Sequence, residues 1–89
     1  GSFDCSGLTM FAWGAAGVSL PHSSAAQYSA ASPVSSSSLQ PGDLVFYYSP
    51  ISHVGLYIGG GRIIHAPHPG RSVEIVGLHS MPYVGAARP

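Results

Sequence analysis

The chain has 89 residues, of which 45% are hydrophobic and 7% charged. This is far from the charge-rich, apolar-poor composition of disordered segments, and the length fits one small domain over residues 1–89. Three arginines balance three acids without any lysine, so no basic stripe exists for nucleic acid or an anionic membrane. No apolar run approaches the roughly 20 residues of a transmembrane helix. We therefore expect no nucleic-acid partner and no membrane insertion.

The first predicted element is a helix between Asp4 and Gly17. Asp4 is suited to capping its start and Gly17 to ending it. Apolar residues cover nearly all of its sides and leave Thr9 almost alone as a polar residue. A helix that is apolar all round is typically central and buried.

A short surface helix is predicted within residues 22–31, with Ser23 or Ser24 as its cap. The Ser-rich run 32–38 is predicted to be a loop. Beyond it, turn residues separate short β-type runs, which indicates an α+β domain whose first helix packs on a five-stranded antiparallel sheet. The predicted strands are Leu44–Tyr48, Val54–Ile58, Arg62–Ala66, Val73–Val76 and Tyr83–Ala86.

The only cysteine, Cys5, lies at the start of the first helix. A lone cysteine is more often a buried filler than a nucleophile. At a helix start, however, unpaired N–H groups and the helix dipole favour a thiolate. The small neighbours Ser6 and Gly7 keep the sulfur approachable, and Asp4 argues against an apolar pocket. Cys5 is therefore a candidate nucleophile.

A thiolate nucleophile needs a base and a group that orients the base. If Gly59–Gly61 forms a three-residue hairpin loop, paired residues have numbers that sum to 120, and His65 faces Gly55. His53 is then the diagonal neighbour of His65 on the same face of the sheet, within reach of its ring. The same alternation predicts that Val54, Leu56 and Ile58 point into the core. A two-residue loop would reverse this parity and separate the histidines.

Other roles for these residues are also considered. His22, His68 and His79 fall in loop or turn contexts and are predicted to be exposed. A zinc site would need Cys5, His53, His65 and a further ligand, but the sequence has no CxxC or HExxH spacing. We expect no metal and no cofactor. Arg62 and Arg71 are expected to be solvated rather than to bind substrate carboxylates.

Four segments resemble the successive blocks of NlpC/P60 domains. They are D-C-S-G from Asp4, L-P-H-S-S-A-A-Q from Leu20, L-Q-P-G-D-L-V-F-Y from Leu39 and H-V-G-L-Y-I-G-G-G-R-I-I-H-A from His53. They occur in the same order as in the family, and together they span nearly the whole chain. Within this family the chain looks most similar to secreted cell-wall hydrolases of actinobacteria.

The resemblance implies a papain-like fold and a Cys-His-His triad of Cys5, His53 and His65. It implies a secreted or cell-wall-associated, monomeric cysteine peptidase that cuts the γ-D-glutamyl to diaminopimelate bond of peptidoglycan stem peptides. Asp4 and Ser6 correspond to positions that help to hold the substrate peptide. Helix capping is their structural alternative.

The chain departs from the family pattern in two places. Family domains usually begin well before the D-C-S-G block, with a segment whose tyrosine lines the active site, so the domain is expected to be truncated at its N-terminus. His22 stands where many relatives carry arginine. A binding module that has lost turnover, and a papain-like amidase or acyltransferase, therefore remain alternative functions.

Overall fold

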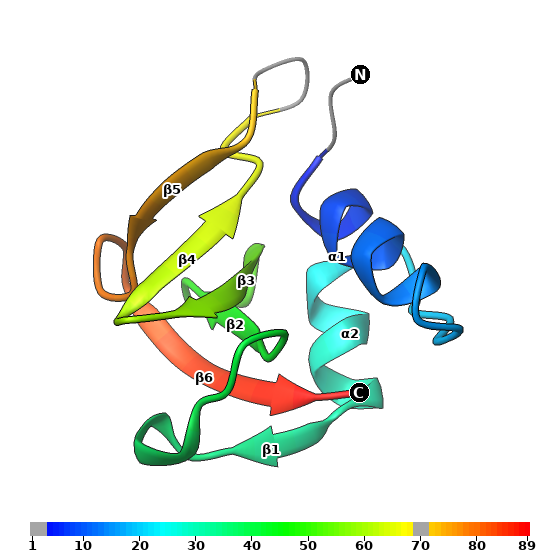
Figure 1. The fold of residues 1–89 in the computed structure, drawn as a ribbon, viewed down its shortest axis with the longest axis horizontal. Coiled ribbons are helices and arrows are strands. Elements are labelled where there is room, and N and C mark those ends of the chain that lie inside the picture. The colour runs from blue at the N-terminus through cyan, green and yellow to red at the C-terminus, as the bar shows by residue number, and fades with distance from the viewer. Residues whose placement is uncertain (1–3, 69–71) are drawn as a thin grey trace.

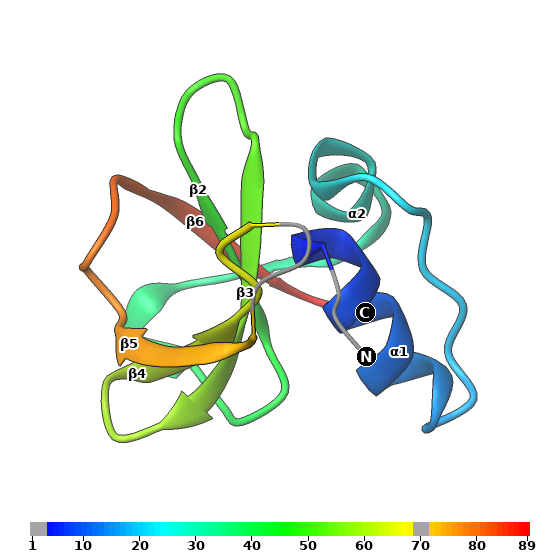
Figure 2. The ribbon, with the colours of Figure 1, turned by 90° about the horizontal axis from the view of Figure 1, so that it is seen from above.

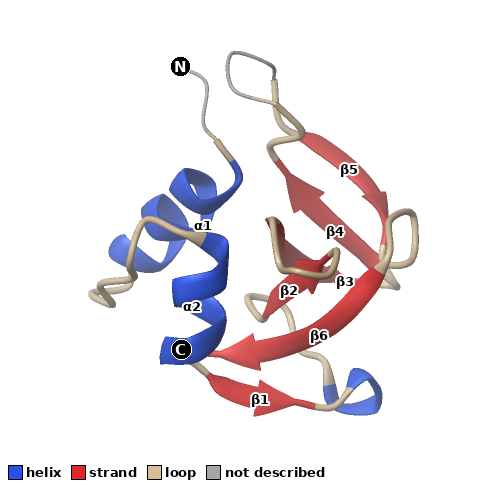
Figure 3. Ribbon diagram, turned by 180° about the vertical axis from the view of Figure 1, so that it is seen from behind, coloured by secondary structure: helices blue, strands red, loops and turns tan. Residues whose placement is uncertain are grey.

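Two helices cover one face of an antiparallel sheet in the computed structural model, which describes residues 4–68 and 72–89 (Figure 1). The helices are α1 (Cys5–Gly14) and α2 (Ser24–Ala30). Figures 2 and 3 show both on the same side of the strands. This arrangement confirms the predicted α+β class.

Within the described residues the sheet has six strands, in the spatial order β1-β6-β2-β3-β4-β5. Each of the five predicted strands is present, with ends that differ from the prediction by at most two residues. The bounds are β1 Ser32–Val34, β2 Leu44–Tyr47, β3 His53–Gly59, β4 Arg62–His65, β5 Glu74–Gly77 and β6 Tyr83–Arg88.

The sixth strand, β1, corrects the prediction of a loop over residues 32–38. Its residues pair with the end of β6, from Ser32 with Arg88 to Val34 with Ala86. Serine and proline are poor strand formers, so the pattern hid this strand. Proline is tolerated here because β1 lies at the edge of the sheet. A 3₁₀ turn, Ser36–Ser38, follows β1.

Helix α1 begins as predicted. Asp4 caps it, since its Oδ1 accepts a hydrogen bond of 2.7 Å from the Gly7 N–H. The α-helical part ends at Gly14, and a turn continues to Gly17, whose φ is +84°. The prediction that α1 is buried all round was wrong, because Phe11 is 65% exposed. Apolar composition shows which residues favour burial, but α1 packs on the sheet with one side only.

Helix α2 also starts where the sequence indicated. Ser23 is its cap, and the Ser23 hydroxyl accepts a hydrogen bond of 3.3 Å from the Ala26 N–H. Although α2 lies at the surface, Gln27 is fully buried. This polar side chain therefore points toward α1 and the sheet rather than toward solvent.

The hairpin of β3 and β4 has the predicted register. Leu56 pairs with Ile64 and Tyr57 with Ile63, so that the paired numbers sum to 120. The register shifts by one beyond Tyr57, at the turn. The three turn glycines, Gly59–Gly61, all have positive φ, between 63° and 92°. Glycine adopts this left-handed region without the steric cost that other residues incur.

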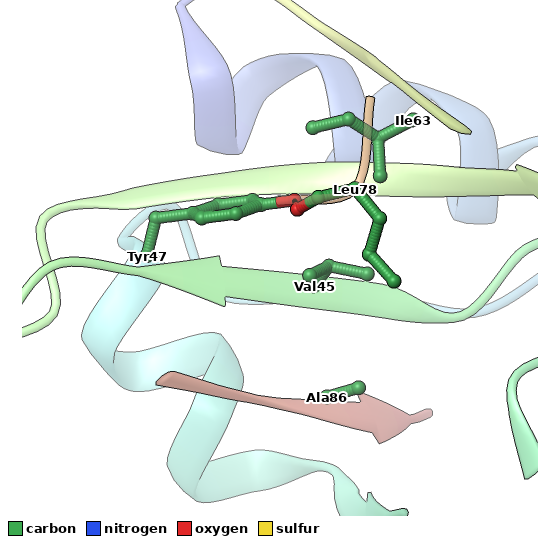
Figure 4. Close-up of a cluster of buried hydrophobic side chains, with 5 residues drawn as sticks. All are labelled: Val45, Tyr47, Ile63, Leu78 and Ala86. Atoms are coloured by element: carbon green, nitrogen blue, oxygen red, sulfur yellow. Dashed lines mark hydrogen bonds between the residues drawn. The ribbon is translucent and has the colours of Figure 1, made fainter. Parts of the chain in front are cut away.

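Both faces of the sheet are buried. The face under the helices holds Leu44, Phe46, Val54 and Ala87. The opposite face holds a second cluster of side chains, shown in Figure 4: Val45, Tyr47, Ile63, Leu78 and Ala86. Ile58, predicted to be a core residue, is 38% exposed, whereas Tyr57 packs against the second cluster. The prediction was therefore wrong for Ile58, although Val54 and Leu56 do pack in the cluster under the helices.

An ion pair between a buried carboxylate and a partly exposed arginine ties the start of β2 to the end of β6. Asp43 is 1% exposed and accepts hydrogen bonds from Arg88 Nε at 2.7 Å and Nη2 at 2.8 Å. Burial by itself raises the pKa of the Asp43 carboxyl. The hydrogen bonds from Arg88 and from the Gln40 N–H outweigh burial, so this pKa lies below its ordinary value.

Arg88→Met should lower the free energy of unfolding, because it leaves the buried Asp43 carboxylate without its cation. Urea unfolding followed by circular dichroism measures this change. Arg62→Met is the matched control at an exposed position, and it should change stability by less than about 0.5 kcal/mol. Equal effects of the two substitutions would contradict the assignment.

Candidate active site

Cys5 is the first residue of α1 and is half-buried. It packs against the hydrophobic cluster that contains Val54, the residue after His53. Helix α1 as a whole lies against β3, the strand that begins with His53. Among the described residues, no hydrogen bond joins the Cys5 thiol to His53 or His65. The pairing of thiol and imidazole therefore stays a prediction.

The structure brings His53 and His65 together. His53 Nε2 lies 2.7 Å from His65 Nδ1, and the rings meet edge to face with centroids 4.9 Å apart. The strand register explains this contact, and Gly55, between His53 and the end of the hairpin, leaves room for the β4 side chains. A Cβ atom at Gly55 would come within 3.4 Å of His65 Cβ and 2.7 Å of Ile63 Cδ1.

Both rings are removed from solvent, with His53 9% and His65 4% exposed. Burial, and the positive charge that His65 and His68 carry when protonated, lower the pKa of His53 to about 4. Burial also lowers the pKa of His65, although the Glu74 carboxylate acts against this shift. The pair is therefore neutral near pH 7, and one ring donates a single hydrogen to the other.

An open pocket with a volume of about 410 Å³ adjoins the two rings. The sequence reasoning left out most of its lining. Tyr48 and Ser52 come from the turn before β3, and Pro67 and His68 from the segment after β4. Among the described residues, the lining consists of Tyr48, Ser52, His53, His65, Pro67, His68 and Met81.

Asp4, predicted to contact substrate, has two partners in the structure. Besides capping α1, its carboxylate accepts hydrogen bonds from His22 Nε2, which lies 3.0 Å from both of its oxygens. The hydrogen bonds from His22 and from the Gly7 N–H hold the pKa of Asp4 below its ordinary value. His22 is thus exposed as predicted, but it also binds the residue that precedes Cys5.

The residue that follows the nucleophile candidate is held by a buried polar network. Ser6, 6% exposed, accepts a hydrogen bond of 3.1 Å on its carbonyl oxygen from Gln27 Nε2. The same nitrogen donates to the Pro21 carbonyl at 2.9 Å, and Gln27 Oε1 accepts from the Thr9 hydroxyl at 2.6 Å. Gln27 thereby fixes the first turn of α1 from the neighbouring helix. The predicted contact of Ser6 with substrate stays a prediction.

The remaining candidates are less informative. Arg62 is exposed at the start of β4, and Arg71 lies outside the described residues. His79 is exposed and packs on the ring of Tyr83, with centroids 5.4 Å apart. Across residues 4–68 and 72–89, no three His, Cys, Asp or Glu side chains lie close enough together to hold a metal ion. In the same ranges, no helix is long and apolar enough to cross a membrane.

The fold and the four sequence blocks define the class of protein. Residues 1–85 match the NlpC/P60 family, and the chain belongs to that family. It is 49% identical over 80 residues to "Probable endopeptidase Rv2190c" of Mycobacterium tuberculosis, an alignment that covers 90% of this chain and 21% of the relative. It is 51% identical over 71 residues to "Probable endopeptidase p60" of Listeria monocytogenes, covering 78% and 15%. The chain thus spans about a fifth or less of these two relatives.

Solved structures of the family have the same fold. An NlpC/P60 family protein from Bacillus cereus aligns with a TM-score of 0.87 and 38% identity over 97% of this chain and 31% of its own. The NlpC/p60 domain of the peptidoglycan hydrolase SagA aligns with a TM-score of 0.84 and 36% identity, over 98% of this chain and 77% of its own. RipD of Mycobacterium tuberculosis aligns with a TM-score of 0.80 and 32% identity, over 97% of this chain and 66% of its own. RipD is described as non-catalytic and adapted to peptidoglycan binding.

Gln27→Leu should lower the free energy of unfolding by about 1 to 2 kcal/mol, because it removes three hydrogen bonds, to the Thr9 hydroxyl and to the carbonyls of Ser6 and Pro21. Thr9 and Ser6 keep a hydrogen bond of 3.0 Å to each other, so only the Pro21 carbonyl loses its donor altogether. Chemical unfolding followed by Trp13 fluorescence measures the loss. Gln40→Leu, at an exposed position, is the matched control and should be nearly neutral. A neutral Gln27→Leu would contradict the proposed support of the helix start.

Proposed function

We propose that this chain is the catalytic domain of a cysteine peptidase that cuts peptidoglycan stem peptides. Cys5 is the nucleophile, His53 the general base and His65 the residue that orients His53. The observation that carries the proposal is the buried 2.7 Å contact between His53 Nε2 and His65 Nδ1, on the strand beside the helix that begins with Cys5. The peptidase names of the relatives support it.

In this proposal each ring nitrogen of His53 has its own task. Because Nε2 is bonded to His65, Nδ1 is the nitrogen left to accept the thiol proton of Cys5. The thiolate then attacks the amide carbonyl, and His53 returns the proton to the leaving amine. In the second step His53 takes a proton from water, whose oxygen attacks the thioester carbonyl. The Cys5 sulfur then leaves and regains its proton from His53, which restores the enzyme. The N–H of Cys5, at the positive end of α1, is the oxyanion donor that we propose.

The substrate is proposed to be a stem peptide with the γ-D-glutamyl to diaminopimelate bond at the nucleophile. The peptidoglycan hydrolase SagA and the peptidoglycan-binding RipD share this fold and support a wall substrate. Asp4 and Ser6, on either side of Cys5, are proposed to hold the peptide. We also propose that the protein acts outside the cell or in its wall, as a monomer; the wall-directed relatives support the proposed location.

RipD supports one alternative, a domain that binds peptidoglycan without turnover. The two functions differ in a measurable outcome, because a binding module retains purified sacculi and releases nothing from them. The presence of Cys5, His53 and His65 in one chain favours catalysis, since wall binding alone does not require a nucleophile and a paired base.

Cys5→Ala should reduce the release of soluble peptides from purified peptidoglycan by at least roughly a thousandfold, because it removes the nucleophile. Liquid chromatography with mass spectrometry identifies the products, and a new amine on diaminopimelate marks the proposed bond. Circular dichroism establishes that the variant is folded. Retained release in Cys5→Ala would refute the mechanism, and binding without release by the unsubstituted chain would establish the binding module.

The acid limb of kcat/KM should lie near pH 4 instead of near the ordinary histidine value of about 6.5. The acid limb moves to lower pH because the pKa of His53 is lowered. His53 stays neutral and able to accept a proton until the pH falls through that pKa. A pH profile on a soluble stem peptide measures the limb. His79→Gln, an exposed histidine outside the pair, should leave it unchanged. A limb near the ordinary value would contradict the role of burial.

A further inference from the structure

One nitrogen of the histidine pair has no hydrogen-bond partner within the described residues. His65 Nε2 is buried, while His65 Nδ1 is bonded to His53. A buried polar atom without a partner is costly, so the surroundings of Nε2 decide how the ring is protonated. Among the described residues, the charged group that faces it is Glu74, whose Oε1 lies 3.9 Å from Nε2.

The strand register brings these two residues together. His65 ends β4, Glu74 begins β5, and the two are direct partners across the antiparallel pair. Side chains of such partners lie on the same face of a sheet. The Glu74 side chain is 44% exposed, whereas that of His65 is 6% exposed. The carboxylate therefore lies at the surface, whereas the nitrogen on which its negative charge acts is buried.

The position of one hydrogen on His65 determines whether His53 can act as a base. If His65 carries its hydrogen on Nε2, its Nδ1 accepts the hydrogen of His53 Nε2–H, and His53 Nδ1 is free to take a proton from a thiol. If His65 carries it on Nδ1, His65 donates to His53 Nε2, and the hydrogen of neutral His53 occupies Nδ1. In that second arrangement His53 has no free nitrogen that can accept the thiol proton.

We propose that Glu74 is a positioning residue of the active site, whose carboxylate keeps the hydrogen of His65 on Nε2. The effect is electrostatic, because a negative charge at 3.9 Å attracts an N–H and repels a lone pair. Glu74 does not touch the reacting atoms, and it acts on them through His65 and His53. The catalytic part of this proposal rests on the proposed function, whereas the tautomer of His65 does not.

The other groups around His65 are consistent with this role. His53 faces it from β3 and is neutral near pH 7, and His68, from the segment after β4, opposes its protonation. Glu74 favours positive charge on the ring and acts against burial. The same carboxylate thus stabilises the Nε2–H form and supports His65 when His53 becomes charged during the reaction.

Glu74→Gln should lower kcat by roughly three- to tenfold with little change in KM, because a neutral amide can face either tautomer of His65. Glu74→Asp, which retains the charge, should recover part of the loss. Arg62→Gln removes an exposed charge from β4, the neighbouring strand, and should leave kcat unchanged. The decisive comparison uses His65→Asn, which can orient His53 but has no tautomers. In that background Glu74→Gln should have no further effect.

Nitrogen chemical shifts of the His65 ring, measured by NMR, test the tautomer without any turnover. We expect Nε2–H in the unsubstituted protein and a mixture of both forms in Glu74→Gln. A ring protonated on Nδ1 in the unsubstituted protein would overturn the proposal, as would an equal loss of kcat in the His65→Asn background. If Cys5→Ala retained activity while the tautomer shifted as expected, the proposed peptidase mechanism would fail and the action of Glu74 on His65 would stand.

Discussion

The register of the β3–β4 hairpin is the constraint on which the candidate site depends. Shifting one strand by one residue would turn His65 to the opposite face of the sheet from His53. Two features hold the register: the turn glycines, all with positive φ, and Gly55, where Ile63 and the backbone of β4 leave no room for a side chain. The contact between the histidines is therefore a consequence of strand pairing, because the paired backbones already hold the two residues on the same face of the sheet.

Burial of both sheet faces explains why these histidines are neutral. With Tyr47 and Ile63 packed on the histidine face, His53 and His65 lie next to a hydrophobic core and lose hydration that a one-sided sheet would leave them. Desolvation disfavours the charged form of imidazole. The packing that stabilises the sheet thus also sets the protonation state on which a base in this position depends.

Much of the fold and of the candidate site was predictable from the sequence, because the patterns that indicate them are local. The Asp4 cap, the glycine turn and the strand alternation each act over a few residues, and together they predicted α1, the hairpin and the histidine pair. Features that depend on distant pairing were not predictable. Strand β1 exists because β6 pairs with it, and Glu74 lies beside His65 because β5 pairs with β4, a register that no local sequence pattern predicts. Nor does apolar patterning reveal how much of α1 the sheet covers.

The two halves of the site are held by different means. Gln27 fixes the start of α1, which carries Cys5, through hydrogen bonds from α2, whereas β-sheet pairing fixes the histidines. Near Cys5, what joins them is hydrophobic packing between α1 and the strands, including the cluster of Val54 against which Cys5 lies. A hydrogen bond of 2.9 Å from Trp13 Nε1 to the Gly42 carbonyl joins α1 to the segment before β2, but it lies at the other end of the helix. Such packing sets distance between elements with less directional precision than hydrogen bonds do. The approach of thiol to imidazole is therefore more sensitive to core packing under α1 than to the geometry within either half.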